Sequence, residues 1–183
     1  MKKIIFTFYC LGFLLVAQAQ KVMPEIKAGT TLSATVYVQS RDVPVLFTIK
    51  RIEAPITFAW FVEGYGEGEF EINQKAFENG KAIYTQQPLQ GITKLGDDET
   101  YGLISKEAYK SLVDHKTFTY NTIKFKTKET GIKPLKFGDK EVDATNVASE
   151  DGKLELWILN NPNFPLILQT TGFGLDILIN EIK

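Results

Sequence analysis

Side chains that could do chemistry are few in this chain, and most of them are carboxylates. Two acidic groups stand out, an alternating set at Glu63, Glu67, Glu69 and Glu71 and a run at Asp97, Asp98 and Glu99. The alternating set is typical of a solvated strand face, because Phe70 and Ile72 occupy the opposite face. The run lacks the Asp-x-Asp/Asn-x-Asp/Asn-Gly spacing of a calcium loop. We therefore predict no metal site, while a carboxylate hydrolase, which needs only two facing carboxylates, stays open as an alternative.

Other catalytic residue types are nearly absent. His115 is the only histidine, which excludes zinc sites built from several histidines, and no Gly-x-Ser-x-Gly elbow supplies a serine for a triad with it. Cys10 is the only cysteine and lies in an apolar N-terminal run, so thiol chemistry and disulfides are not expected. Gly64, Gly66 and Gly68 alternate and lead into no helix, which indicates a bend or bulge rather than a phosphate-binding loop. We therefore predict that the protein is not an enzyme and has no cofactor.

Aromatic residues are the remaining clue. They recur on the predicted strands at Phe58, Trp60, Phe61, Tyr65, Phe70, Phe77 and Trp157. Most are expected in the core, where aromatic side chains contribute much of the packing energy. If the strands enclose space, Phe58, Trp60 and Trp157 would line an apolar cavity. We predict these three as candidate ligand-binding residues.

The elements that carry these residues are predicted mainly as strands. Between residues 31 and 85 apolar and polar residues alternate, as at Leu32, Ala34 and Val36, which is the period of strands with one buried face. The same period returns over residues 118–144, and residues 154–182 are more continuously apolar, which favours central strands. Turn residues separate the runs at Arg41-Asp42, Ala54-Pro55, Asn79-Gly80, Gly138-Asp139 and Asp151-Gly152. This pattern predicts about nine or ten strands.

One helix is predicted, over residues 105–115. Ser105 can cap its N-terminus, and Ala108 with Leu112 and Tyr109 with Val113 form apolar pairs four residues apart. The fold class predicted from these elements is mainly β, as an antiparallel barrel or strongly curved sheet with one short α-helix. A two-sheet β-sandwich is the alternative, because a period of two does not distinguish a closed sheet from two packed ones.

The N-terminus has the pattern of a cleavable secretory signal. Met1-Lys2-Lys3 precedes an apolar run over residues 4–17, and Ala17-Gln18-Ala19 has the small residues of a cleavage site. The run is shorter than the roughly 20 residues that span a bilayer. We therefore predict a signal peptide over residues 1–19, a single β domain over residues 20–183, and no membrane span after cleavage. The expected location is the periplasm or cell envelope of a Gram-negative bacterium.

Charge and composition limit the classes of binding partner that we expect. The chain has 21 basic and 22 acidic residues, for a net charge of −1, and no block of like charge. This balance does not favour a nucleic-acid partner. The partners that we expect are an apolar small molecule or another envelope protein, and the oligomeric state stays open.

Three segments also resemble a known group of proteins. Residues 155–168 read ELWILNNPNFPLIL, residues 59–64 read AWFVEG, and Thr100-Tyr101 precedes the predicted helix. With these segments the chain resembles exported bacterial proteins of the domain-of-unknown-function family 3108, over most of residues 20–183. The resemblance implies a curved, barrel-like β structure in the cell envelope. That family carries no established catalytic residues, so the resemblance implies none here.

Three functions follow from these observations. The leading prediction is a non-catalytic envelope protein that binds an apolar or amphipathic ligand through a barrel-like β scaffold. The first alternative is a structural or assembly accessory that binds another envelope protein through an exposed face or sheet edge. The second alternative is a carboxylate-based hydrolase. An open apolar cavity would favour the first, a filled interior the second, and two facing carboxylates the third.

Overall fold

The computed structural model describes residues 21–38, 41–86 and 88–183. The predicted signal peptide, residues 1–19, and Cys10 within it lie outside the described residues. The described chain contains the helices α1 (Gln74–Asn79) and α2 (Lys106–His115). Its strands are β1 (Thr31–Val38), β2 (Arg41–Arg51), β3 (Ile56–Val62), β4 (Gly66–Ile72), β5 (Ala82–Ile83), β6 (Gly91–Lys94), β7 (Glu99–Thr100), β8 (Thr117–Tyr120), β9 (Ile123–Thr127), β10 (Lys136–Phe137), β11 (Lys140–Glu141), β12 (Ala144–Ser149), β13 (Glu155–Leu159), β14 (Ile167–Thr171) and β15 (Asp176–Ile182).

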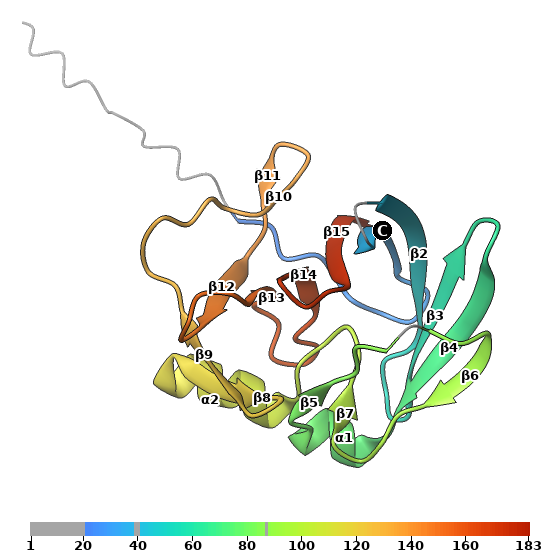
Figure 1. The fold of residues 1–183 in the computed structure, drawn as a ribbon, viewed down its shortest axis with the longest axis horizontal. Coiled ribbons are helices and arrows are strands. Elements are labelled where there is room, and N and C mark those ends of the chain that lie inside the picture. The colour runs from blue at the N-terminus through green and yellow to red at the C-terminus, as the bar shows by residue number, and fades with distance from the viewer. Residues whose placement is uncertain (1–20, 39–40, 87) are drawn as a thin grey trace, which may run out of the picture.

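One large sheet dominates the fold, and the protein is mainly β, as predicted. Its strand order is β6-β4-β3-β2-β1-β15-β14-β13-β12-β9-β8. Neighbouring strands of this sheet run antiparallel except β4 and β6, which pair in parallel at one edge. Within the described chain the order ends at β6 and at β8, so the sheet keeps two edges and does not close into a barrel. Figure 1 shows the strands arranged in a strongly curved layer, with α1 and α2 along one side.

The centre of the sheet brings together the first and last strands of the described residues. β1 pairs with β2 on one side and with the last strand, β15, on the other. The backbones of Thr31 and Lys183 exchange two hydrogen bonds of 2.8 and 3.0 Å, so the C-terminus lies beside the start of β1 (Figure 1). As predicted from their apolar sequence, β13, β14 and β15 are interior strands of this sheet.

Helix α2 forms where the sequence predicts it. The Ser105 side-chain oxygen accepts a hydrogen bond from the Ala108 N–H at 3.3 Å, which confirms the predicted cap. Ala108, Tyr109 and Leu112 are buried on one face. Val113 is 50% exposed, so the predicted pair of Tyr109 and Val113 does not lie on the buried face.

Helix α1 was not predicted, and it corrects the expectation of one helix. Asn73 caps it by accepting a hydrogen bond from the Ala76 N–H at 2.9 Å. Asn79-Gly80, predicted as a hairpin turn, ends this helix instead: Gly80 has a φ of −55° and donates to the Ala76 carbonyl at 2.8 Å. Neither helix of the described residues has the length and apolar character that a bilayer span requires.

Two hydrophobic clusters fill the protein. The larger one lies against β1, β2, β3, β4 and β15, and the smaller one lies between α2 and the strands β8, β9, β12 and β13. Strand β13 contributes to both, because Leu156 and Ile158 belong to the smaller cluster while Leu159 belongs to the larger one. Strands β12, β13 and β14 are therefore covered on both faces, whereas the strands beside the larger cluster have one outer face toward solvent.

Candidate ligand-binding site

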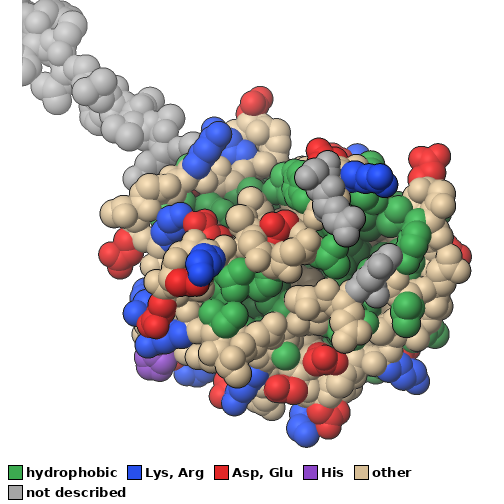
Figure 2. Space-filling view, viewed as in Figure 1, with side chains coloured by type: hydrophobic (Ala, Val, Ile, Leu, Met, Phe, Trp, Pro, Cys, Tyr) green, Lys and Arg blue, Asp and Glu red, His purple; other side chains and the backbone are tan. Residues whose placement is uncertain are grey.

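An apolar cavity of about 780 Å³ lies inside the curved part of the sheet. Its lining comes mainly from β1, β2, β3, β14 and β15, together with Tyr84, Tyr101 and Phe173 from connecting segments. A volume of this size is within the range of small-molecule pockets, roughly 300–1,000 Å³. Figure 2 shows hydrophobic side chains gathered around a hollow on the face that carries β2 and β15. The cavity is therefore the candidate ligand-binding site.

The strand register explains why apolar side chains meet here. Val36 of β1 lies opposite Val43 of β2 and Ile177 of β15, and Phe47 of β2 lies opposite Trp60 of β3. Side chains alternate between the faces of a sheet, so each of these strands presents every second residue to the cavity. The period of two in the sequence thus builds one continuous apolar wall from four strands.

Gly68 leaves the space that Trp60 occupies. The two residues are partners across β3 and β4. A Cβ atom at Gly68 would lie 2.8 Å from Trp60 Cζ2 and 2.7 Å from the Gly91 carbonyl oxygen. Real Cβ atoms do not approach other heavy atoms this closely, so a larger residue would displace the indole or β6.

Gly64, in the same glycine series, has a φ of 75° in the turn between β3 and β4, as the predicted bend requires.

Tyr101 places a phenol in the lining of the cavity. Its ring stacks on Phe70 with centroids 4.0 Å apart, and it contacts Phe47 and Phe58 with centroids 6.0 and 6.5 Å away. Burial raises the pKa of the Tyr101 hydroxyl above its ordinary value, so the group stays protonated at neutral pH. The cavity therefore contains a neutral hydrogen-bond donor among aromatic rings.

Polar side chains lie at the rim of the cavity. Arg41, Glu63, Thr85 and Gln86 belong to its lining and are exposed to solvent. Tyr65 fastens the neighbouring loop, because its hydroxyl donates to the Pro88 carbonyl at 3.2 Å and its own carbonyl accepts from Gln90 Nε2 at 2.8 Å. This arrangement suits a molecule whose apolar part lies inside and whose polar end reaches solvent.

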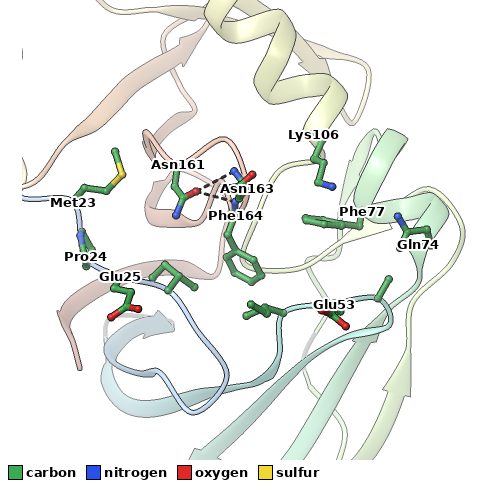
Figure 3. Close-up of a pocket in the computed structure, with 13 residues that line it drawn as sticks. Met23, Pro24, Glu25, Glu53, Gln74, Phe77, Lys106, Asn161, Asn163 and Phe164 are labelled. Atoms are coloured by element: carbon green, nitrogen blue, oxygen red, sulfur yellow. Dashed lines mark hydrogen bonds between the residues drawn. The ribbon is translucent and has the colours of Figure 1, made fainter.

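A second cleft, of about 570 Å³, lies between the N-terminal segment, α1 and the turn after β13 (Figure 3). Two of its polar side chains, those of Asn161 and Lys106, make contacts within the protein. The Asn161 side-chain oxygen accepts hydrogen bonds from the backbone N–H groups of Asn163 and Phe164 at 3.0 and 3.2 Å. Lys106 Nζ lies 4.6 Å from the centroid of the Phe77 ring. The NNPNFP segment therefore forms a tight turn here.

Two of the three predicted lining residues lie in the cavity. Phe58 and Trp60 belong to its lining, with exposed fractions of 1% and 2%. Trp157 does not belong to the lining; it is half-buried on β13 and packs against the larger hydrophobic cluster. The pairing of β13 with β14 shifts register between Trp157 and Ile158. The structure thus brings Phe58 and Trp60 together and leaves Trp157 elsewhere.

The predicted solvated stripe on β4 forms ion pairs on the outer face of the sheet. Lys50 Nζ lies 2.8 Å from the Glu69 carboxylate, and Lys94 Nζ lies 3.7 Å from that of Glu71. These exposed pairs are worth little to stability. Glu69 and Glu71 therefore do not face the cavity, whereas Glu63, the first residue of the predicted stripe, lies at its rim.

The acidic run before α2 also has structural partners. Asp97 pairs with Lys75 at 3.0 Å, and Asp98 and Glu99 accept hydrogen bonds from backbone N–H groups at 3.1 and 3.0 Å. In the part of the chain that the structure describes, no group of three or more His, Cys, Asp or Glu residues could hold a metal ion. His115 is exposed at the end of α2.

No protein-family model, curated protein or solved structure matches this chain. The resemblance to the domain-of-unknown-function family 3108 therefore stays a prediction. The candidate site is defined by the geometry and chemistry of the cavity.

Proposed function

We propose that this protein is an exported, non-catalytic cell-envelope protein that binds an apolar or amphipathic small molecule within its curved, barrel-like sheet. The observation that carries this proposal is the cavity of about 780 Å³ with its apolar and aromatic lining. Each Å² of apolar surface that the ligand and the cavity remove from water contributes roughly 25 cal/mol to the free energy of binding, which favours a hydrocarbon occupant. The proposed location in the periplasm or envelope of a Gram-negative bacterium rests on the signal pattern of residues 1–19.

The chemistry of the lining supports binding over catalysis. Its charged residues are Arg41 and Glu63, both at the exposed rim. Glycoside hydrolysis uses two carboxylates on opposite sides of the scissile bond, and this lining offers one. In the second cleft, Figure 3 shows Glu25 and Glu53 on separate segments, with carboxylates that do not point toward one another.

Native mass spectrometry of protein purified from its own envelope fraction tests the proposal. We expect extra mass that is lost on denaturation, and we expect it to be much reduced in a Val36→Phe/Val43→Phe variant, which fills the cavity from two paired strands. The matched control is Ser33→Phe/Leu46→Phe, a pair on the other face of the same strands. Equal bound mass in both variants, or bare protein throughout, would overturn the proposal.

A second candidate, binding to another envelope protein, is favoured by the β6 edge. Ile92 on this strand and Leu89 before it are 62% and 66% exposed, and an edge strand presents unpaired backbone groups to a partner strand. This function is tested by affinity purification from the envelope, which compares the proteins that copurify with the wild-type protein and with the Ile92→Lys variant. Loss of one specific partner in the variant would support it, and an unchanged set of partners would reject it.

A further inference from the structure

The Tyr101 hydroxyl belongs to a half-buried side chain whose ring stacks on Phe70. Among the described residues it makes no hydrogen bond, and burial alone accounts for the raised pKa of this group. Trp60 Nε1 is the one fully buried side-chain nitrogen or oxygen without a partner in the same part of the chain. The Tyr101 hydroxyl, which also lacks a partner, therefore keeps some accessible surface. Since Tyr101 lines the cavity, that surface opens into it.

Tyr120 shows how this protein treats a tyrosine whose role is structural. Its hydroxyl is buried in the smaller cluster and accepts a hydrogen bond from the Ser105 N–H at 2.6 Å. Thr100 Oγ1 lies 3.4 Å from the same hydroxyl. A buried hydroxyl without such partners is costly, so groups of this kind in native proteins call for an explanation. The Tyr120 hydroxyl is bonded to a backbone N–H group, whereas the Tyr101 hydroxyl faces the cavity.

We infer that the ligand has an apolar body that carries an uncharged oxygen acceptor, such as a ketone, ester or ether, and that this oxygen accepts a hydrogen bond from Tyr101. The inference rests on the proposed function. An uncharged acceptor fits because the charged lining residues, Arg41 and Glu63, are at the rim, and burying an unpaired charge near the phenol would be costly. The neutral phenol donates one hydrogen bond, which matches one carbonyl or ether oxygen.

Displacement of the fluorescent apolar probe N-phenyl-1-naphthylamine by 2-decanone and by n-decane tests this inference. The two competitors differ by one carbonyl oxygen. The ratio of the concentrations at which n-decane and 2-decanone displace half of the probe therefore measures the contribution of this hydrogen-bond acceptor to binding. In Tyr101→Phe we expect the advantage of 2-decanone over n-decane to fall by roughly two- to tenfold relative to the wild-type protein, the value of one hydrogen bond. Binding of n-decane should stay unchanged, because the phenyl ring fills the same space.

Tyr120→Phe is the matched control, since it removes a hydroxyl that already has protein partners. It should lower stability and leave the ratio at the wild-type value. An unchanged ratio in Tyr101→Phe, with both competitors still displacing the probe, would overturn the inference and leave the proposed function standing. If the wild-type protein bound neither the probe nor either competitor, both would be overturned.

Discussion

At the scale of single residues, Gly68 leaves the space in which Trp60, a lining residue of the cavity, packs. The absent Cβ leaves room for the Trp60 indole on one side and for the backbone of Leu89 and Gly91 on the other. Trp60 is 2% exposed and lies 5.8 Å from the Tyr65 ring, centroid to centroid. The wall of the cavity and the edge strand β6 thus depend on the same glycine.

Gly68→Ala should therefore weaken both stability and binding. Because the added methyl group would overlap backbone oxygens and the indole, we expect a loss of about 1–3 kcal/mol in the free energy of unfolding. Urea denaturation measures this loss, and titration with N-phenyl-1-naphthylamine measures the loss of binding. Glu67→Ala, at the exposed neighbouring position, is the control and should change neither. Wild-type behaviour of Gly68→Ala would contradict the described packing.

The raised pKa of Tyr101 also leads us to expect that the free energy of unfolding depends on pH. Because burial raises the pKa of Tyr101, the folded protein holds the phenolic proton more tightly than the unfolded chain, whose tyrosines titrate near about 10. The stabilising contribution is therefore full below about pH 10 and is lost as the pH rises above it. Tyr101→Phe should flatten the fall in unfolding free energy as the pH rises above about 10.

Urea denaturation across this pH range provides the measurement. Part of the fall should remain in the variant, because burial also raises the pKa values of Tyr109 and Tyr120. Tyr37→Phe, at an exposed position on β1, serves as the control and should keep the wild-type slope. Identical slopes in Tyr101→Phe and Tyr37→Phe would show that Tyr101 is not held in a buried environment.

The sequence could predict part of the candidate site at this scale. Phe58 and Trp60 stand on one strand with a clear period of two, so their common face follows from local pattern. Trp157 stands beside a register shift, and which cluster its side chain joins depends on packing from both sides of β13. Tyr101 follows the two-residue strand β7, where no periodicity indicates a face. Its place in the cavity depends on Phe47, Phe58 and Phe70, which are distant in sequence.

At the scale of elements, Ser105 connects the two helices. Its hydroxyl donates to the Gly80 carbonyl at the end of α1 at 2.8 Å, while the same oxygen caps α2. Ser105 is 1% exposed, so these hydrogen bonds are shielded from water. The segment that carries Tyr101 lies directly before this cap, and the position of the phenol therefore depends on the junction between the helices.

Ser105→Ala should lower the free energy of unfolding by about 1–3 kcal/mol, since it removes the cap and leaves the Gly80 carbonyl without its partner. Thermal or urea denaturation measures this change. Thr119→Ala, at an exposed position on β8, should have little effect. Equal stability of the two variants would contradict the described junction.

The elements also show where sequence pattern stops being informative. Long strands such as β1 and β2 follow from alternation alone. Helix α1 has six residues, too few to show a helical period, and its terminal Asn-Gly has the composition of a hairpin turn. The parallel pairing of β4 with β6 crosses a connection that contains α1, so no local turn signal indicates it.

At the scale of the whole molecule, the cavity exists because the sheet curves without closing. β1 and β2 come from the start of the described chain, and β15 comes from its end, yet they form adjacent parts of one wall. Helix α2 and the smaller cluster cover one face of β12 and β13, beside this wall. The fold class could be predicted from composition and period, whereas the cavity could not, because it depends on contacts between segments far apart in sequence.

The central claim is that an apolar molecule occupies this cavity beside Trp60. Energy transfer from Trp60 to N-phenyl-1-naphthylamine tests it most directly in a Trp157→Phe protein, which keeps Trp60 as its single tryptophan. We predict saturable energy transfer that is strongly reduced by Val36→Phe/Val43→Phe and retained in Ser33→Phe/Leu46→Phe. Absence of saturable transfer, or equal transfer in both double variants, would contradict the account.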